Sequence, residues 1–210
     1  MTKLSIRHIA FLTPGNYDDA DPRRGLEDTL SLFEHGEAIG FDSAWIRQRH
    51  LEPGVSSAAA FLAAATQRTR RIGLGTAVIQ MGYENPFRLA EDLSLVDVLS
   101  AGRLNIGLSA GPPPFGKLLG HRLLDGDPAA IDFSHARVAR LAKNIEGEWL
   151  GDADTRITSA AGEHRPRLRP HAPGLRQRLW YGGCSLRSAR WAAENGFHLL
   201  VGNINTAEET

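Results

Sequence analysis

The chain has 210 residues, of which 42% are hydrophobic and 23% are charged, and its 24 Lys and Arg residues balance 24 Asp and Glu residues. This length fits one domain with a sizeable core. A net charge of zero removes the general positive field on which nucleic-acid-binding and polybasic membrane proteins depend, so we expect neither partner. The single cysteine, Cys184, excludes an internal disulfide framework.

The N-terminal segment does not have the pattern of a targeting signal. Its apolar run before Pro14 is only a few residues long, too short for the core of a signal peptide or for a membrane span. We therefore expect a cytoplasmic protein.

Short apolar runs alternate with longer segments of helical period along the chain. The predicted strands are Ile6 to Leu12, Ser43 to Arg47, Arg71 to Gln80, Arg103 to Ser109, Arg178 to Gly183 and His198 to Gly202. The predicted helices between them are Gly25 to Ile39, Ser56 to Gln67, Pro86 to Leu99, Ser134 to Leu150 and 186 to 195. This alternation predicts an α/β fold with a parallel sheet, either open and doubly wound or curled into a barrel.

Two segments interrupt the alternation inside what we take as one domain, residues 1–210. Residues 112–133 begin with a proline run and look irregular, and residues 151–177 are rich in Arg, Pro, Gly and His without apolar period. We expect surface excursions at both places, the second with a short hairpin. The helix from Ser134 should expose Arg137, Arg140 and Lys143 to solvent, and the last eight residues should begin another helix.

Two predicted strand ends have the composition of a ligand site. Small residues in GTAVIQ, 75 to 80, would let a planar ring approach the backbone, although simple packing explains them equally well. In YGGCSLRS, 181 to 188, a glycine pair precedes a helix start at which Ser185, Ser188 and free amides form a phosphate cradle, with Arg187 as a further cationic contact. Ordinary helix capping is the alternative.

Four stretches together resemble the luciferase-like family of flavin-dependent monooxygenases, over nearly the whole chain. They are IGFDSAWIRQRH at 39–50, TRRIGLGTAVIQ at 69–80, NPFRLAEDLSLVDVLSAGRLNIGLSAG at 85–111 and RLWYGGCSLRSARWAAENG at 178–196. The resemblance implies a TIM-type (β/α) barrel of eight strands that binds reduced FMN, delivered by a separate flavin reductase, and oxygenates a small organic substrate. It also implies a homodimer formed through the first helices. A related branch of the family uses a deazaflavin coenzyme for hydride transfer.

The resemblance assigns flavin contacts to particular positions of this chain. Ala77 and Val78 would lie beneath the flavin ring, joined by a cis peptide bond as in several relatives. Ser109 would contact the ring or the phosphate, or would be a buried strand serine bonded to the backbone. The phosphate would lie at the segment that contains Gly183, Cys184, Ser185, Arg187 and Ser188. An arginine that helps to bind the phosphate in bacterial luciferase is replaced here by Ala110.

The segment after the second predicted strand departs from the family pattern. Many relatives carry Glu-His-His there, whereas this chain has Gln48, Arg49 and His50. Arg49 replaces the histidine that assists flavin chemistry in relatives, and a guanidinium group stabilises anions but does not release a proton. A histidine ordinarily titrates near neutral pH, so His50 is the nearby candidate for acid–base catalysis. The alternative is that His50 packs under a loop.

The other histidines lack the spacing of a zinc site, so we expect no metal. Only about six of the eight strands of such a barrel are present, and the last two β/α units are lacking. We expect a fragment or a truncated gene product. A dimer that covers the open edges and a different closure of the six strands are the alternatives. Two alternatives to the monooxygenase remain, a deazaflavin-dependent hydride-transfer enzyme and a shortened, non-catalytic flavin-binding relative.

Overall fold

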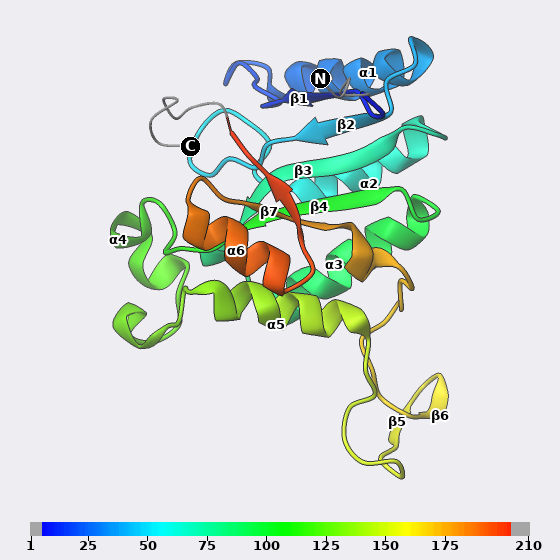
Figure 1. Ribbon diagram of the computed structural model, residues 1–210, viewed down its shortest axis with the longest axis vertical. Helices are drawn as coiled ribbons and strands as arrows, with labels where there is room; N and C mark the ends of the chain where they lie inside the picture. The colour runs from blue at the N-terminus through cyan, green and yellow to red at the C-terminus, as the bar shows by residue number, and fades with distance from the viewer. Residues whose placement is uncertain (1–5, 203–210) are drawn as a thin grey trace, which may run out of the picture.

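The computed structural model describes residues 6–202, and its centre is a parallel sheet of six strands. In spatial order the strands are β1 (Ala10–Thr13), β2 (Ser43–Ile46), β3 (Gly73–Gln80), β4 (Leu104–Ser109), β7 (Leu179–Gly182) and β8 (His198–Leu200). Each strand pairs in parallel with its neighbours. All six therefore end at the same edge of the sheet, where parallel α/β proteins build their sites (Figure 1).

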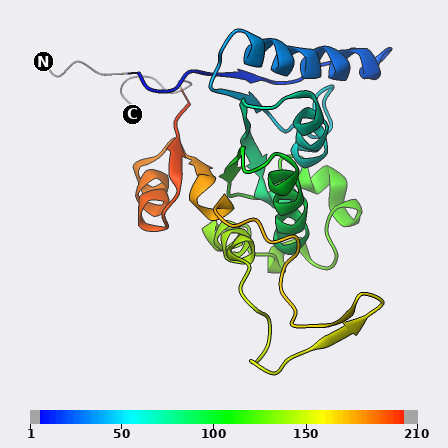
Figure 2. The same ribbon diagram turned by 90° about the vertical axis from the view of Figure 1, so that its right-hand side faces the viewer.

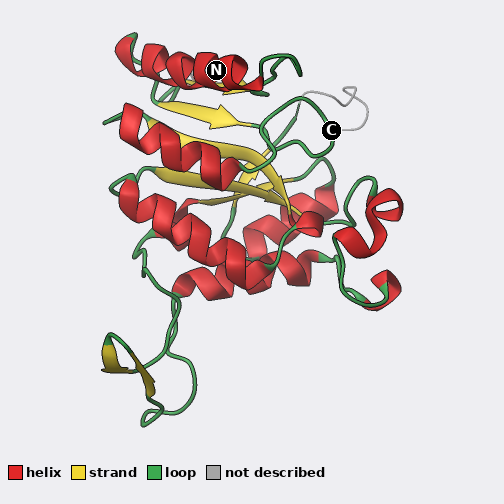
Figure 3. Cartoon of the chain, turned by 180° about the vertical axis from the view of Figure 1, so that it is seen from behind, coloured by secondary structure: helices red, strands yellow, loops and turns green. Residues whose placement is uncertain are grey.

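The helices cover the outer side of the sheet. They are α1 (Pro22–Ala38), α2 (Ala58–Arg68), α3 (Pro86–Leu99), α5 (His135–Glu146) and α6 (Leu186–Glu194). Figure 2 shows them as an arc around the curled sheet, and Figure 3 shows the outer side from behind. The molecule is a half-barrel with alternating strands and helices, which confirms the predicted incomplete TIM-type barrel.

The two faces of the sheet are packed differently. Toward the helices, strand residues such as Leu74 and Ile106 are fully buried in one apolar core. Toward the inside of the barrel, the rings of Trp45 and Trp180 meet edge to face with centroids 5.5 Å apart. Gly75 makes room for this pair, because a Cβ atom there would lie 2.2 Å from the indole of Trp45. A cavity of about 570 Å³ remains on this inner face.

The N-terminal region differs from the prediction. The strand predicted from Ile6 to Leu12 begins only at Ala10, and it is an edge strand in which Leu12 is 55% exposed. An apolar run alone does not distinguish a central strand from an edge strand. The first helix starts three residues earlier than predicted, at Pro22, because the carboxylate of Asp21 caps it by accepting from the backbone N–H of Arg24.

The fourth long helix also ends earlier than predicted. It stops at Glu146, since Gly147 adopts the left-handed conformation with φ 69°. The predicted solvent-exposed face is wrong for Arg137, whose guanidinium donates to the backbone carbonyl groups of Met81 and Glu84. A periodic run of cations predicts a helix face but not what packs against it.

Both excursions contain local structure. Residues 112–133 hold three short helical turns, α4 (Gly116–Leu119), η2 (Gly120–Arg122) and η3 (Pro128–Ala130). Residues 151–177 contain the expected hairpin, β5 (Ile157–Ser159) with β6 (Gly162–His164), which projects away from the barrel in Figure 1. The helix expected in residues 203–210 lies outside the described residues. Within residues 6–202, no helix has the length and apolar character to cross a membrane.

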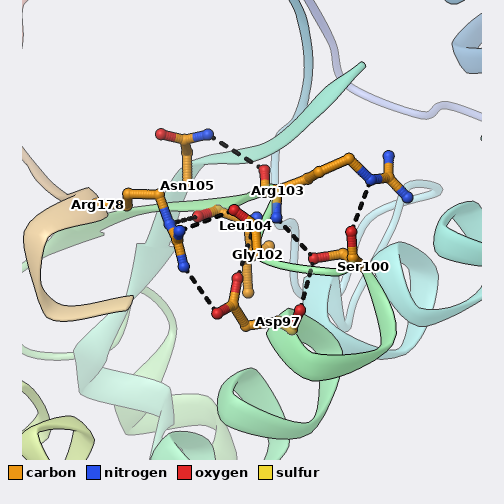
Figure 4. Close-up of polar contacts among 7 residues, drawn as sticks. All are labelled: Asp97, Ser100, Gly102, Arg103, Leu104, Asn105 and Arg178. Atoms are coloured by element: carbon orange, nitrogen blue, oxygen red, sulfur yellow. Dashed lines mark hydrogen bonds and ion pairs between the residues drawn. The ribbon is translucent and has the colours of Figure 1, made fainter. Parts of the chain in front are cut away.

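A polar network ties the strands together at their N-terminal end (Figure 4). Arg178, just before β7, donates to the carbonyl groups of Gly102 and Leu104 and forms a 2.7 Å ion pair with Asp97 of α3. Burial raises the pKa of Asp97 although the charge of Arg178 opposes that shift. The Arg103 guanidinium likewise donates to backbone carbonyl groups in the turn before β3. These contacts hold β3, β4 and β7 in register at the end opposite the candidate site.

Removal of the Arg178 guanidinium should destabilise the fold. Arg178→Ala leaves the carboxylate of Asp97, which is 4% exposed, without its cation, and we expect a loss of about 3 kcal/mol in the free energy of unfolding. Urea denaturation measures it. Arg24→Ala is the matched control, because its ion pair with Asp28 is exposed and 3.9 Å long, so it should cost less than about 0.5 kcal/mol. Equal losses for the two variants would contradict this account.

Candidate functional site

The carboxyl ends of β3, β4 and β7 lie next to one another. Gln80 pairs with Ser109 across β3 and β4, and the register shifts between Thr76 and Ile79. The peptide bond between Ala77 and Val78 is cis, as the family resemblance predicts. Ala77 faces the cavity inside the barrel. The sheet thus brings the β3 residues of the predicted flavin site alongside Ser109.

The start of α6 is built as the sequence suggests. Ser185 caps the helix, with its Oγ accepting from the backbone N–H of Ser188 at 3.2 Å and donating to the Ser188 hydroxyl at 3.1 Å. Gly183 is required, because a Cβ atom there would lie 2.7 Å from the Cβ of Ser188. Cys184 and Ser185 are exposed. Two hydroxyl groups and a helix N-terminus therefore lie together beside the end of β7.

Tyr181 connects this helix start to β4. Its buried hydroxyl accepts a 3.3 Å hydrogen bond from the backbone N–H of Ala110. Burial raises the pKa of the phenol, while hydrogen bonds from Ala110 and with Ser188 lower it. Gly182 lies against Val78, since a Cβ atom there would be 2.9 Å from the valine side chain. Val78, Ala110, Gly183 and the two serines thus belong to one group at the strand ends.

Arg187 points elsewhere than the sequence suggests. It is exposed and lines a cavity of about 350 Å³ between α5 and α6, together with His135 and Trp191. The His135 ring stacks on Trp191, with centroids 4.5 Å apart. Burial and the charge of Arg187 both lower the pKa of His135. No sequence pattern points to His135, and only the packing of α5 against α6 places it near this helix start.

A second polar group surrounds Gln48, just beyond β2. The Gln48 side chain is buried, and its Oε1 accepts a 2.9 Å hydrogen bond from the backbone N–H of Ala58. Its Nε2 donates to the Glu84 carboxylate at 2.9 Å and lies 3.0 Å from Nε2 of His50. The His50 ring stacks on Tyr83 at 3.9 Å between centroids. The sequence did not single out Glu84 or Tyr83, although both directly follow the end of β3, where polar residues can join a site.

Arg49 and His50 take different positions in this group. Arg49 is half-buried and forms a 2.9 Å ion pair with Glu52. His50 is also half-buried, and burial lowers its pKa from the ordinary value of 6.5. Burial likewise raises the pKa of Glu84. The structure therefore brings His50 together with a glutamine and a carboxyl group, whereas Arg49 is engaged by its own acidic partner.

The loop after β4 links the two polar groups. The Tyr83 hydroxyl donates to the carbonyl of Pro114. Gly82 approaches the backbone of Pro112 so closely that a Cβ atom would lie 2.5 Å from the nitrogen of Pro113. Residues 110–114 thus run from the Tyr181 hydroxyl to Tyr83, and both groups lie at the carboxyl edge of the sheet. The arrangement offers anion-binding hydroxyls and amides on one side and a titratable imidazole on the other.

Comparison with known proteins agrees with this fold. The family model described as luciferase-like monooxygenase matches residues 6–210, and the chain belongs to that family. It is 36% identical over 150 residues to limonene 1,2-monooxygenase of Rhodococcus erythropolis, covering 67% of this chain and 38% of the relative. It is 36% identical over 172 residues to 4-hydroxyprotoasukamycin monooxygenase of Streptomyces nodosus subsp. asukaensis, covering 79% of this chain and 44% of the relative.

A solved structure shows the same fold. The crystal structure of a monooxygenase from Streptomyces bottropensis superposes with a TM-score of 0.69 at 25% identity, covering 97% of this chain and 62% of that one. The chain thus spans less than two thirds of the length of the relatives that it matches. The two curated relatives and the solved structure are all named monooxygenases.

His50 should titrate below its ordinary range. Because burial lowers its pKa from 6.5, we expect the ring to be neutral at pH 7 and to gain its proton below pH 6.5. The unfolded chain then binds this proton more tightly, so His50 should lower the stability of the fold as the pH falls below 6.5. An NMR titration of the ring measures the pKa. A His50 pKa above 6.5 would contradict the assignment.

Proposed function

We propose that this chain is the flavin-binding part of an FMN-dependent, two-component monooxygenase, which takes reduced flavin from a separate reductase and oxygenates a small organic substrate. The observation that carries the proposal is the group of hydroxyls and amides at the start of α6, next to the ends of β3 and β4. Family membership supplies the chemistry to be tested.

The residues present fit a flavin phosphate. Ser185 and Ser188 offer hydroxyl groups at a helix N-terminus, where backbone amides favour an anion. The tight space at Gly183 keeps the strand end close to that helix start. Arg187 lies on the neighbouring cavity beside His135, so its side chain would have to turn toward the phosphate to contribute. Cys184 lies between Gly183 and Ser185, so its backbone would line the phosphate site.

The other residues of the site would serve the ring and the substrate. Ala77 and Val78 would lie beneath the flavin ring, with Ser109 at the neighbouring strand end. The reduced flavin would supply the electrons with which one atom of O2 enters the substrate and the other leaves as water. Arg49 is paired with Glu52 and would have to turn from it to stabilise negative charge near the ring. His50 would be the polar group that contacts the reacting atoms. The apolar cavity walls would keep water out.

The phosphate assignment predicts a selective loss of affinity. Ser188→Ala removes one hydroxyl but retains the backbone N–H that Ser185 caps, so the helix start should persist. We expect FMN affinity to fall about tenfold, because a hydrogen bond to a charged group is lost, while affinity for riboflavin, which lacks the phosphate, stays unchanged. Fluorescence titration measures both, and Ser159→Ala in the exposed hairpin is the control. Equal losses for FMN and riboflavin would contradict the assignment.

Deazaflavin-dependent hydride transfer is the second candidate function, and Arg49 favours it. An arginine stands at the position of the usual catalytic histidine and does not exchange protons near neutral pH, and the absence of that histidine motivates this candidate. Tight binding of the deazaflavin coenzyme without binding of FMN would replace our cofactor assignment. Binding of FMN without turnover under any supply of reductase and O2 would instead support a shortened, non-catalytic relative.

We also propose that the protein forms a homodimer through its first helices. Leu32 of α1 and Ile39 at its C-terminal end are 42% and 60% exposed, and a second copy would cover them. Sedimentation should give twice the mass of one chain, and Leu32→Glu should shift it toward the monomer. Leu118→Glu, at a residue that is 74% exposed in the 112–133 excursion, should leave the dimer intact. A monomeric parent protein would contradict the proposal.

A further inference from the structure

The side-chain amide of Gln48 has only one possible orientation. Oε1 faces the backbone N–H of Ala58, which is a donor, and Nε2 faces the Glu84 carboxylate, which is an acceptor. If the amide were flipped, a donor would meet a donor at Ala58 and an acceptor would meet an acceptor at Glu84. These two contacts therefore fix the NH2 group on the side of Glu84 and His50.

This orientation constrains the His50 ring. The Gln48 NH2 group has two hydrogens, and one of them is directed to Glu84. The other points to Nε2 of His50, 3.0 Å away, so that Nε2 must be the unprotonated nitrogen that accepts it. In a neutral imidazole the proton then lies on Nδ1. Stacking on Tyr83 holds the ring plane in this position.

We propose that Glu84, acting through Gln48, is a positioning residue that holds His50 in the neutral tautomer protonated on Nδ1, so that His50 offers a hydrogen-bond donor at the carboxyl edge of the sheet. Among residues 6–202, Nδ1 has no hydrogen-bond acceptor. The Nδ1–H group is thus available for an anionic oxygen or nitrogen of a bound ligand. Its use toward flavin or substrate rests on the proposed function, whereas the tautomer itself does not.

The charges around His50 are compatible with this tautomer. The Gln48 amide stands between the Glu84 carboxyl group and the ring. Arg137 binds the backbone carbonyl of Glu84 rather than the ring, and Glu52 is engaged by Arg49. Protonation of Nε2 would direct its N–H at the Gln48 NH2 group, and neither group could then accept. His50 is therefore a donor through Nδ1 and a poor base through Nε2.

The tautomer can be measured directly from the 15N chemical shifts of the His50 ring at neutral pH, without flavin. We expect Nε2 at the shift of an unprotonated nitrogen and the Nδ1–H form in about tenfold excess or more, because the other form leaves a donor without an acceptor. Protonation of Nε2 in the parent protein would overturn the proposal. The measurement is made without FMN. A wrong tautomer assignment and a wrong cofactor assignment therefore remain distinguishable.

Variants of the chain separate the role of Glu84 from simple packing. Glu84→Gln retains an oxygen that can accept from Gln48, so the Nδ1–H form should persist. Glu84→Ala removes the acceptor and should reduce the excess of that form severalfold. Gln48→Glu places a carboxylate oxygen opposite Nε2 and should move the proton to Nε2. An unchanged tautomer in Glu84→Ala, with the parent spectrum otherwise preserved, would overturn the role of Glu84.

Discussion

The pairing of β4 with β3 on one side and with β7 on the other determines where the candidate flavin-binding residues lie. Because all three strands run in parallel, their carboxyl ends meet at one edge. Arg103 and Arg178 secure the opposite end through the carbonyl groups of the turns that precede the strands. A shift of one residue between β4 and β7 would separate Tyr181 from Ala110 and move α6 away from β3. The site thus depends on contacts at the far end of the barrel.

The local signals of the sequence predicted much of this arrangement. Ser185 was identified as a residue at a helix start, and the structure confirms it as the cap of α6. Pro86 marked the start of α3 correctly. Such features depend on a few neighbouring residues, so composition and spacing reveal them. The resemblance to the family supplied the barrel, which periodicity alone left open between two architectures.

Other features required the three-dimensional structure. The contact between Gln48 and Glu84 joins residues 36 positions apart, and no periodic pattern connects them. The sequence predicts a solvent-exposed face that includes Arg137, because it does not show that this helix packs beside the turn after β3. The exposed edge strand β1 and the position of Arg187 were missed for the same reason. Long-range packing, rather than local propensity, decides such contacts.

The proposed function requires that the start of α6 hold the phosphate of FMN. A crystal structure of the protein with FMN tests it most directly. Phosphate density within hydrogen-bond distance of the Ser185 and Ser188 hydroxyls would support the claim, with the flavin ring directed toward Ala77 and Val78. Phosphate bound at another place, or no FMN in crystals grown at saturating concentration, would contradict it.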